Sequence, residues 1–145
     1  MSRKDALLRS QVEREAQCLV IPGKPVPKAR HQVRLYRGGV ITYTPAKTRE
    51  FEKAVRVYAL KHRIKKQDGE LAVIVTFYTN GPGDVDNLLK SLLDGLNGVA
   101  WEDDRQVKAV VGIKLECKKG EERTEVTIRR MEELVDILLG LAKAG

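Results

Sequence analysis

Residues 71–98 read LAVIVTFYT, NGPG, DVDNLLKSLLDGLNG. The first nine residues are rich in Val, Ile, Phe and Tyr, which predicts a strand buried on both faces. The Gly and Pro residues at 80–83 break this strand. Leucines then recur at helical spacing from about Asp86 to Asn97, and Gly98 is the expected stop signal. The stretch therefore predicts a strand, a turn and an amphipathic helix.

The flanking sequence adds the other elements of an α+β domain. Thr44 and Pro45 are a typical helix start, with Thr44 as N-cap and Pro45 at the first helical position. A buried face of Phe51, Ala54, Val55, Tyr58 and His62 continues this helix to about Lys66. The remaining predictions are a strand at 18–21, a hairpin of 33–36 with 40–43, strands at 107–117 and 124–130, and an amphipathic helix at 131–142. One small α+β domain with a mixed β-sheet is expected.

Composition indicates a single domain. The chain has 145 residues, of which 42% are hydrophobic and 32% charged, and it needs no disulfide or zinc to build a core. We divide it into an arm or short helix at 1–17, the main domain at 18–130 and a C-terminal amphipathic helix at 131–145. Cys18 and Cys117 lack partners at metal-ligand spacing and are expected to be free thiols in a cytoplasmic protein. No secretory signal and no membrane span is visible.

Charge is distributed unevenly along the chain. The formal net charge is +7, but residues 24–66 hold 13 Lys or Arg against two Glu, a net of +11. Residues 84–104 hold six acids against one Lys, a net of −5. A basic region beside a carboxylate cluster suits a protein that holds a polyanion and brings divalent cations to it. The alternative is that the lysines form a solvated face and the acids occupy caps and turns.

The acidic residues have a spacing that favours a metal site. Asp84 and Asp86 point to the same side of an extended segment. Lys90 is four residues after Asp86 and shares its helix face. We expect the helix to return the chain so that Asp103 or Asp104 joins this group. Clustered carboxylates need cations, and hard oxygen ligands select Mg²⁺ or Mn²⁺ over Zn²⁺.

A purely structural interpretation of these residues stays open at this point. Asp84 or Asp86 could be an ordinary N-cap, and Asp103 with Asp104 could form a turn. Asp86 and Lys90 could form a surface ion pair worth about half a kcal/mol or less.

Four blocks of the sequence together resemble one known family. The residues at 84–99 and at 101–107, with PGKPVPKAR at 22–30 and TYTP at 42–45, are similar to the RusA family of Holliday-junction resolvases, especially its phage-type members. The resemblance covers roughly residues 18–130. It implies a small dimeric Mg²⁺-dependent endodeoxyribonuclease with an α+β fold, in which Mn²⁺ can replace Mg²⁺.

The resemblance also implies roles for single residues. Asp84 and Asp86 match the paired catalytic acids, Lys90 the essential lysine and Asp104 the third acid, so that Asp84, Asp86 and Asp104 would bind the metal. Asp103 is then a supporting residue, or an alternative ligand. Arg105 departs from the family pattern, because it places a cation where many relatives have a small residue.

The expected substrate is a four-way DNA junction, cut by a homodimer with two sites that match the two equivalent strands. Basic side chains of the loop, hairpin and first long helix are expected to contact phosphates: Lys24, Lys28, Arg30, Arg34, Arg37, Arg49, Lys53 and Arg56. Two rivals remain, a Mg²⁺ nuclease for other branched DNA or RNA and a non-catalytic junction-binding module. No phosphate-binding Gly-rich Lys loop is present, which disfavours an NTPase, and two histidines give little support to a histidine-metal nuclease.

Overall fold

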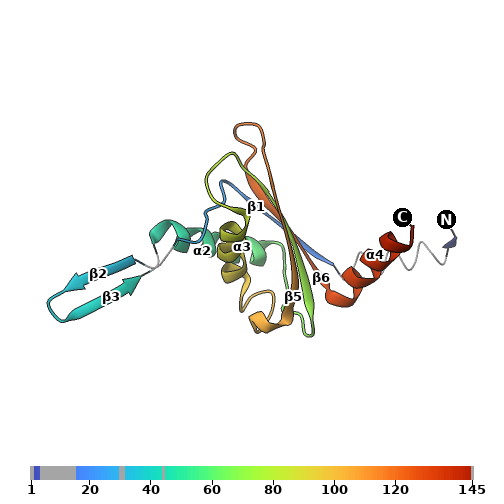
Figure 1. The fold of residues 1–145 in the computed structure, drawn as a ribbon, viewed down its shortest axis with the longest axis horizontal. Helices are drawn as coiled ribbons and strands as arrows, with labels where there is room; N and C mark the ends of the chain where they lie inside the picture. Colours follow the sequence, from blue (N-terminus) through green and yellow to red (C-terminus); the bar gives the residue numbers. More distant parts are fainter. Residues whose placement is uncertain (1, 4–15, 30–31, 44, 145) are drawn as a thin grey trace.

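Strands and helices alternate in the order that the hydrophobic patterns predict (Figure 1). The computed structural model describes residues 2–3, 16–29, 32–43 and 45–144, so most of the predicted arm lies outside the described residues. The elements are β1 (Gln17–Pro22), β2 (Gln32–Tyr36), β3 (Gly39–Tyr43), α2 (Ala46–Lys61), β4 (Leu71–Tyr78), α3 (Val85–Leu96), η1 (Asp104–Gln106), β5 (Val107–Leu115), β6 (Arg123–Arg130) and α4 (Met131–Ala144).

Four strands form one mixed sheet, in the order β1, β6, β4, β5. β4 pairs antiparallel with β6 and parallel with β5. In the parallel pair Leu71 is opposite Val107 and Tyr78 is opposite Leu115, so both strands start at one edge of the sheet and finish at the other. The expected single α+β domain with a mixed sheet is confirmed.

The core lies between this sheet and the two helices α2 and α3, which cover the same face (Figure 1). Leu88, Leu92 and Leu96 of α3 are fully buried, as their helical spacing predicts. Gly95 allows α2 to approach closely, because a Cβ at this position would lie 2.8 Å from Cβ of Val55. The strands contribute alternate residues to the same core: Leu19, Ile21, Val73, Val75, Phe77, Val126 and Ile128.

The helix predicted for residues 44–66 differs from α2 at both ends. Pro45 is the N-cap residue rather than the first helical residue, and Thr44 lies outside the described residues. The helix stops at Lys61 because Arg63 takes a left-handed φ of 56°. The N–H of Ile64 then donates to the carbonyl of Ala59 at 2.9 Å, which closes the last turn.

Two elements extend from the body. The predicted hairpin is confirmed as β2 and β3, a separate two-stranded sheet that projects away on the side of α2 (Figure 1). α4 projects at the opposite end and buries Leu134. Several other large apolar residues of α4 are exposed: Val135, Ile137, Leu138, Leu139 and Leu141. In the part of the chain that the structure describes, no helix is long and apolar enough to cross a membrane.

Candidate active site

The turn that joins β4 to α3 positions the two paired acids. Asp84 is the N-cap residue of α3 and has extended backbone angles, φ −73° and ψ 154°. Its side chain makes no capping hydrogen bond, so it is not an ordinary cap. Asp86 lies in the first turn of the helix, where the helix dipole favours negative charge.

Asp84, Asp86 and Lys90 are exposed. Among the described residues their side chains have no hydrogen-bond or ion-pair partner, so the surface ion pair between Asp86 and Lys90 that the structural interpretation allowed is not formed. Lys90 lies one helical turn after Asp86, at a spacing that puts both on one helix face. The three side chains are therefore available to a ligand in solution.

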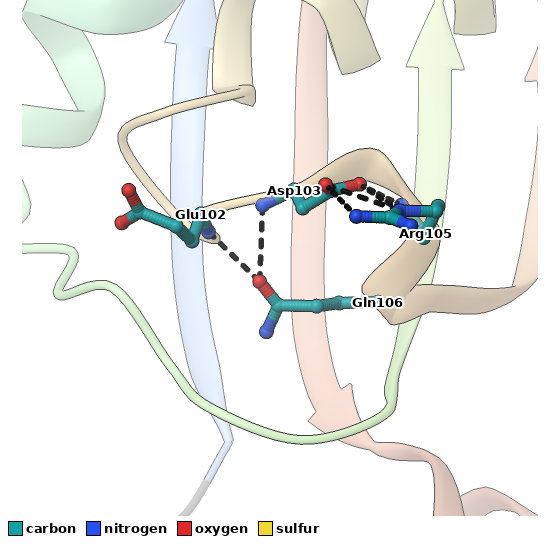
Figure 2. A network of polar contacts seen from close by, with 4 residues as sticks. All are labelled: Glu102, Asp103, Arg105 and Gln106. Carbon is teal, nitrogen blue, oxygen red and sulfur yellow. Dashed lines mark hydrogen bonds and ion pairs between the residues drawn. The ribbon is translucent and has the colours of Figure 1, made fainter.

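The other two acids differ sharply in their surroundings. Asp103 caps η1: its carboxylate accepts from the backbone N of Arg105 at 2.8 Å and from the guanidinium of Arg105 at 2.9 Å (Figure 2). Gln106 completes the cap, because its Oε1 accepts from the backbone N of Asp103 at 3.1 Å. These hydrogen bonds from Arg105 lower the pKa of Asp103. Asp103 thus has a structural role. Its partner is Arg105, the cation that departs from the family pattern.

Asp104 is exposed, and among the described residues it accepts one hydrogen bond, from Nε1 of the buried Trp101 to its Oδ1 at 3.1 Å. It shares a pocket with Asp94 at the far end of α3. A second oxygen of Asp104 therefore stays available to a ligand.

The structure does not bring Asp104 to Asp84 and Asp86 within one chain. η1 directly precedes β5, so Asp104 lies at the edge where both parallel strands start, and Asp84, which follows β4, lies at the edge where they finish. Along β4, seven residue steps from Leu71 to Tyr78 separate these edges, or about 23 Å at about 3.3 Å per residue. The expected gathering of three carboxylates is wrong for a single chain, because the helix returns the chain to the start of the parallel strand. In the described ranges, no three His, Cys, Asp or Glu side chains could together hold a metal ion.

Two carboxylates nevertheless fit a hydrated divalent cation. Mg²⁺ keeps several waters and is commonly held by one or two carboxylates together with substrate phosphate oxygens. Asp84 and Asp86 supply two exposed carboxylates two residues apart, and no donor among the described residues competes for their oxygens. These oxygen donors suit a hard cation. A third acid would have to come from outside this part of the chain.

The predicted phosphate-binding residues fall into distinct groups. Arg30 and the side chain of Arg34 lie outside the described residues. Lys24, Arg37, Arg49, Lys53 and Arg56 are all exposed.

Lys28 has a different role from the predicted one. Its Nζ lies 2.6 Å from Oε1 of Glu52 on α2 and 2.9 Å from Oδ2 of Asp94 on α3. Partial burial alone would lower the pKa of Lys28, but hydrogen bonds to Asp94 and Glu52 outweigh it and raise the pKa. Lys28 is therefore an internal ion-pair residue whose charge is already compensated.

Sequence reasoning missed one cation close to the site. Nζ of Lys114 on β5 donates to the carbonyl oxygens of Gly81 and Gly83, both at 3.0 Å. Lys114 looks in the sequence like any outward lysine of an alternating strand. Only the parallel pairing of β4 with β5 places it beside the turn that precedes Asp84.

Exposed carboxylates beside a basic helix, on an α+β fold, are typical of enzymes that hydrolyse phosphodiester bonds. The family model Endodeoxyribonuclease RusA matches residues 22–129, a range that includes Asp84, Asp86, Lys90 and Asp104. The chain belongs to the RusA family of endodeoxyribonucleases and is a DNA-cleaving endonuclease of the Holliday-junction resolvase type. No curated protein matches it.

Proposed function

We propose that this endonuclease resolves four-way DNA junctions by paired, Mg²⁺-dependent hydrolysis of phosphodiester bonds, with Mn²⁺ able to replace Mg²⁺. The observation that carries the proposal is the exposed group of Asp84, Asp86 and Lys90 at the start of α3, whose side chains have no partner among the described residues. Family membership supplies the class of reaction and of substrate.

Asp84 and Asp86 would hold the cation, and a bound divalent cation supplies a water of lowered pKa and neutralises charge on the leaving oxygen. Lys90 extends from the same helix, one turn further on. Its ammonium would donate to a non-bridging oxygen of the scissile phosphate and stabilise the charge that develops there in the transition state.

Phosphate contacts would orient the junction. Arg49, Lys53 and Arg56 are exposed along α2, which packs against α3, the helix that begins at the paired acids. Arg37 at the turn of the projecting hairpin extends the positive surface outward. Such contacts fix the position of DNA and carry little sequence information. They therefore suit an enzyme that selects a branched shape.

A homodimer would complete the set of carboxylates. Asp104 of a single chain lies at the opposite sheet edge from Asp84, so it can join a metal site only with a second copy of the chain. A two-fold dimer places the same surfaces of both copies in reciprocal contact, and it would create two equivalent sites. Two sites match the two strands that junction resolution has to cut.

Incubation of the wild type and Asp86→Asn with a mobile four-way junction, a flap and a linear duplex, in Mg²⁺ or in EDTA, tests the proposal. The wild type is expected to cut the junction in Mg²⁺ only, and Asp86→Asn to cut nothing. Asp68→Asn, which removes an equal charge from an exposed acid before β4, is the matched control and should behave as the wild type. Equal cleavage of flaps would favour a general branched-DNA nuclease, and junction binding without cleavage by the wild type would contradict the proposal.

A further inference from the structure

The turn of residues 79–83 decides where the paired acids lie. It begins where β4 ends and leads directly into Asp84, with Gly83 at a left-handed φ of 110°. Glycine is needed here, because a Cβ at Gly83 would also lie 2.8 Å from Cβ of Pro27. An irregular segment of this kind has carbonyl groups that no helix or sheet satisfies, so other parts of the protein have to hold them.

Lys114 holds two of these carbonyls. Its Nζ donates to the oxygens of Gly81 and Gly83 at 3.0 Å each, which ties both ends of the Gly-Pro-Gly segment to one point on β5. Charge-assisted hydrogen bonds are about twice as strong as neutral ones. The ammonium group has three donors, so two are committed to the turn.

The beginning of the turn is fixed independently. The side-chain amide of Asn80 donates to the carbonyl of Cys117 at 2.7 Å and accepts from its backbone N at 3.1 Å. The hydroxyl of Thr79 donates to Glu122 at 2.6 Å and accepts from the backbone N of Gly81 at 2.9 Å. Among the described side chains, Lys114 is the one that forms a hydrogen bond to Gly83, the turn residue next to the acids.

We propose that Lys114 is a positioning residue for the nuclease reaction, which acts through the Gly81–Gly83 backbone to fix the carboxylates of Asp84 and Asp86 for cation binding. This inference rests on the proposed function and adds a residue to it. Asp84 and Asp86, the N-cap and a first-turn residue of α3, can bind one cation well only when their separation is fixed before binding, because ordering the turn would otherwise oppose binding. Partners that orient metal ligands typically affect metal affinity or activity by about 10–100-fold when they are removed.

Lys114→Met tests the inference, with Lys108→Met as its control. Lys108 lies on the same strand and is exposed, so both variants lose one positive charge. The readout that does not depend on activity is Mn²⁺ binding to the protein without DNA. The relaxation rate of water protons measures this binding. The Mn²⁺ concentration for half-maximal junction cleavage and the dissociation constant for the junction in EDTA are measured beside it.

Lys114→Met is expected to weaken Mn²⁺ binding and raise the half-maximal concentration by about tenfold or more, with junction affinity in EDTA equal to that of Lys108→Met. Lys114→Arg, whose longer side chain keeps charged donors, should recover most of the Mn²⁺ affinity.

Equal Mn²⁺ binding by Lys114→Met and Lys108→Met would overturn the inference, and so would a loss confined to junction affinity, which would assign Lys114 to a phosphate. Loss of the far-ultraviolet circular dichroism of the sheet would also overturn it. If the wild type binds Mn²⁺ but cuts no junction, the proposed function fails, and the Mn²⁺ titration still decides the role of Lys114.

Discussion

The hydrogen bonds of the acidic residues near α3 distinguish structural acids from acids that are available to a cation. Asp103 is saturated by Arg105 and caps a turn, whereas Asp84 occupies a cap position without capping. Adjacent acids in the sequence, Asp103 and Asp104, therefore differ in availability, which the sequence pattern alone left open. Free carboxylate oxygens mark the residues that a cation can use.

Replacing either paired acid should separate binding from cleavage. We expect Asp84→Asn and Asp86→Asn each to abolish cleavage, while junction affinity stays equal or rises, because removing negative charge near DNA does not weaken phosphate contacts. Gel-shift titration in EDTA and cleavage in Mg²⁺ measure the two effects on the same preparation. Retained cleavage in one variant would remove that residue from the metal site.

Replacement of Lys90 distinguishes a catalytic role of this residue from a structural one. It has no partner among the described residues, so Lys90→Ala should cost only a few tenths of a kcal/mol of stability. As a cation at the scissile phosphate it should lower turnover on the order of a hundredfold. Single-turnover cleavage and thermal unfolding check the two values, and a fall in stability that matches the fall in activity would argue against catalysis.

Among the elements, the segment between β1 and the hairpin is held to both α2 and α3 by hydrogen bonds and ion pairs. Lys28 bridges Glu52 on α2 and Asp94 on α3, and its backbone N donates to the carbonyl of Asn87 at 2.9 Å. Ser91 of α3 also donates to the carbonyl of Val26. The sequence predicts a DNA-binding loop here, but part of this segment holds the two helices together. Lys24 is its exposed cation.

Lys28→Met should consequently destabilise the fold more than it weakens DNA binding. Loss of the two charged contacts is expected to cost about 1–3 kcal/mol of unfolding free energy. The raised pKa of Lys28 means that this contribution is present at neutral pH and is lost as the pH rises above the lysine's ordinary value. Urea unfolding at neutral and alkaline pH measures it. Lys53→Met on the exposed face of α2 should show the opposite pattern, weaker DNA binding at unchanged stability.

Local patterns predicted the elements well and their spatial relations poorly. The alternating strands, the leucine stripe of α3 and the hairpin all follow from residues close together in the chain. The end of α2 was placed too late, because the left-handed turn at Arg63 has no Gly or Pro to signal it. Asp104 was placed with Asp84 because the direction of β5 beside β4 depends on pairing between distant residues. The contacts of Lys28 and Lys114 depend on tertiary packing in the same way.

At the scale of the whole molecule, the separation of Asp104 from the paired acids points to assembly. α4 adds exposed Val135, Leu138 and Leu141 at one end of the chain, an apolar surface that one subunit leaves uncovered. We expect equilibrium sedimentation to show a dimer for the wild type and for Asp86→Asn alike. A monomer that cuts both strands in one binding event would refute this expectation.

Mixed dimers test whether each site draws on two chains. Asp84→Asn and Asp104→Asn are each expected to be inactive, but a mixed dimer of the two has one site with all its acids intact if Asp104 comes from the partner. Random mixing should then restore about a quarter of the wild-type sites, each able to make one nick. If every site lies within one chain, mixing restores nothing.

Resolution of a cruciform in a supercoiled plasmid tests paired, Mg²⁺-dependent cleavage, because paired cuts yield linear DNA and a single nick yields an open circle. The wild type is expected to give linear product without an accumulating open circle in Mg²⁺, and no product is expected in EDTA or with Asp86→Asn. Open circles alone, or linear product that persists in EDTA, would contradict it.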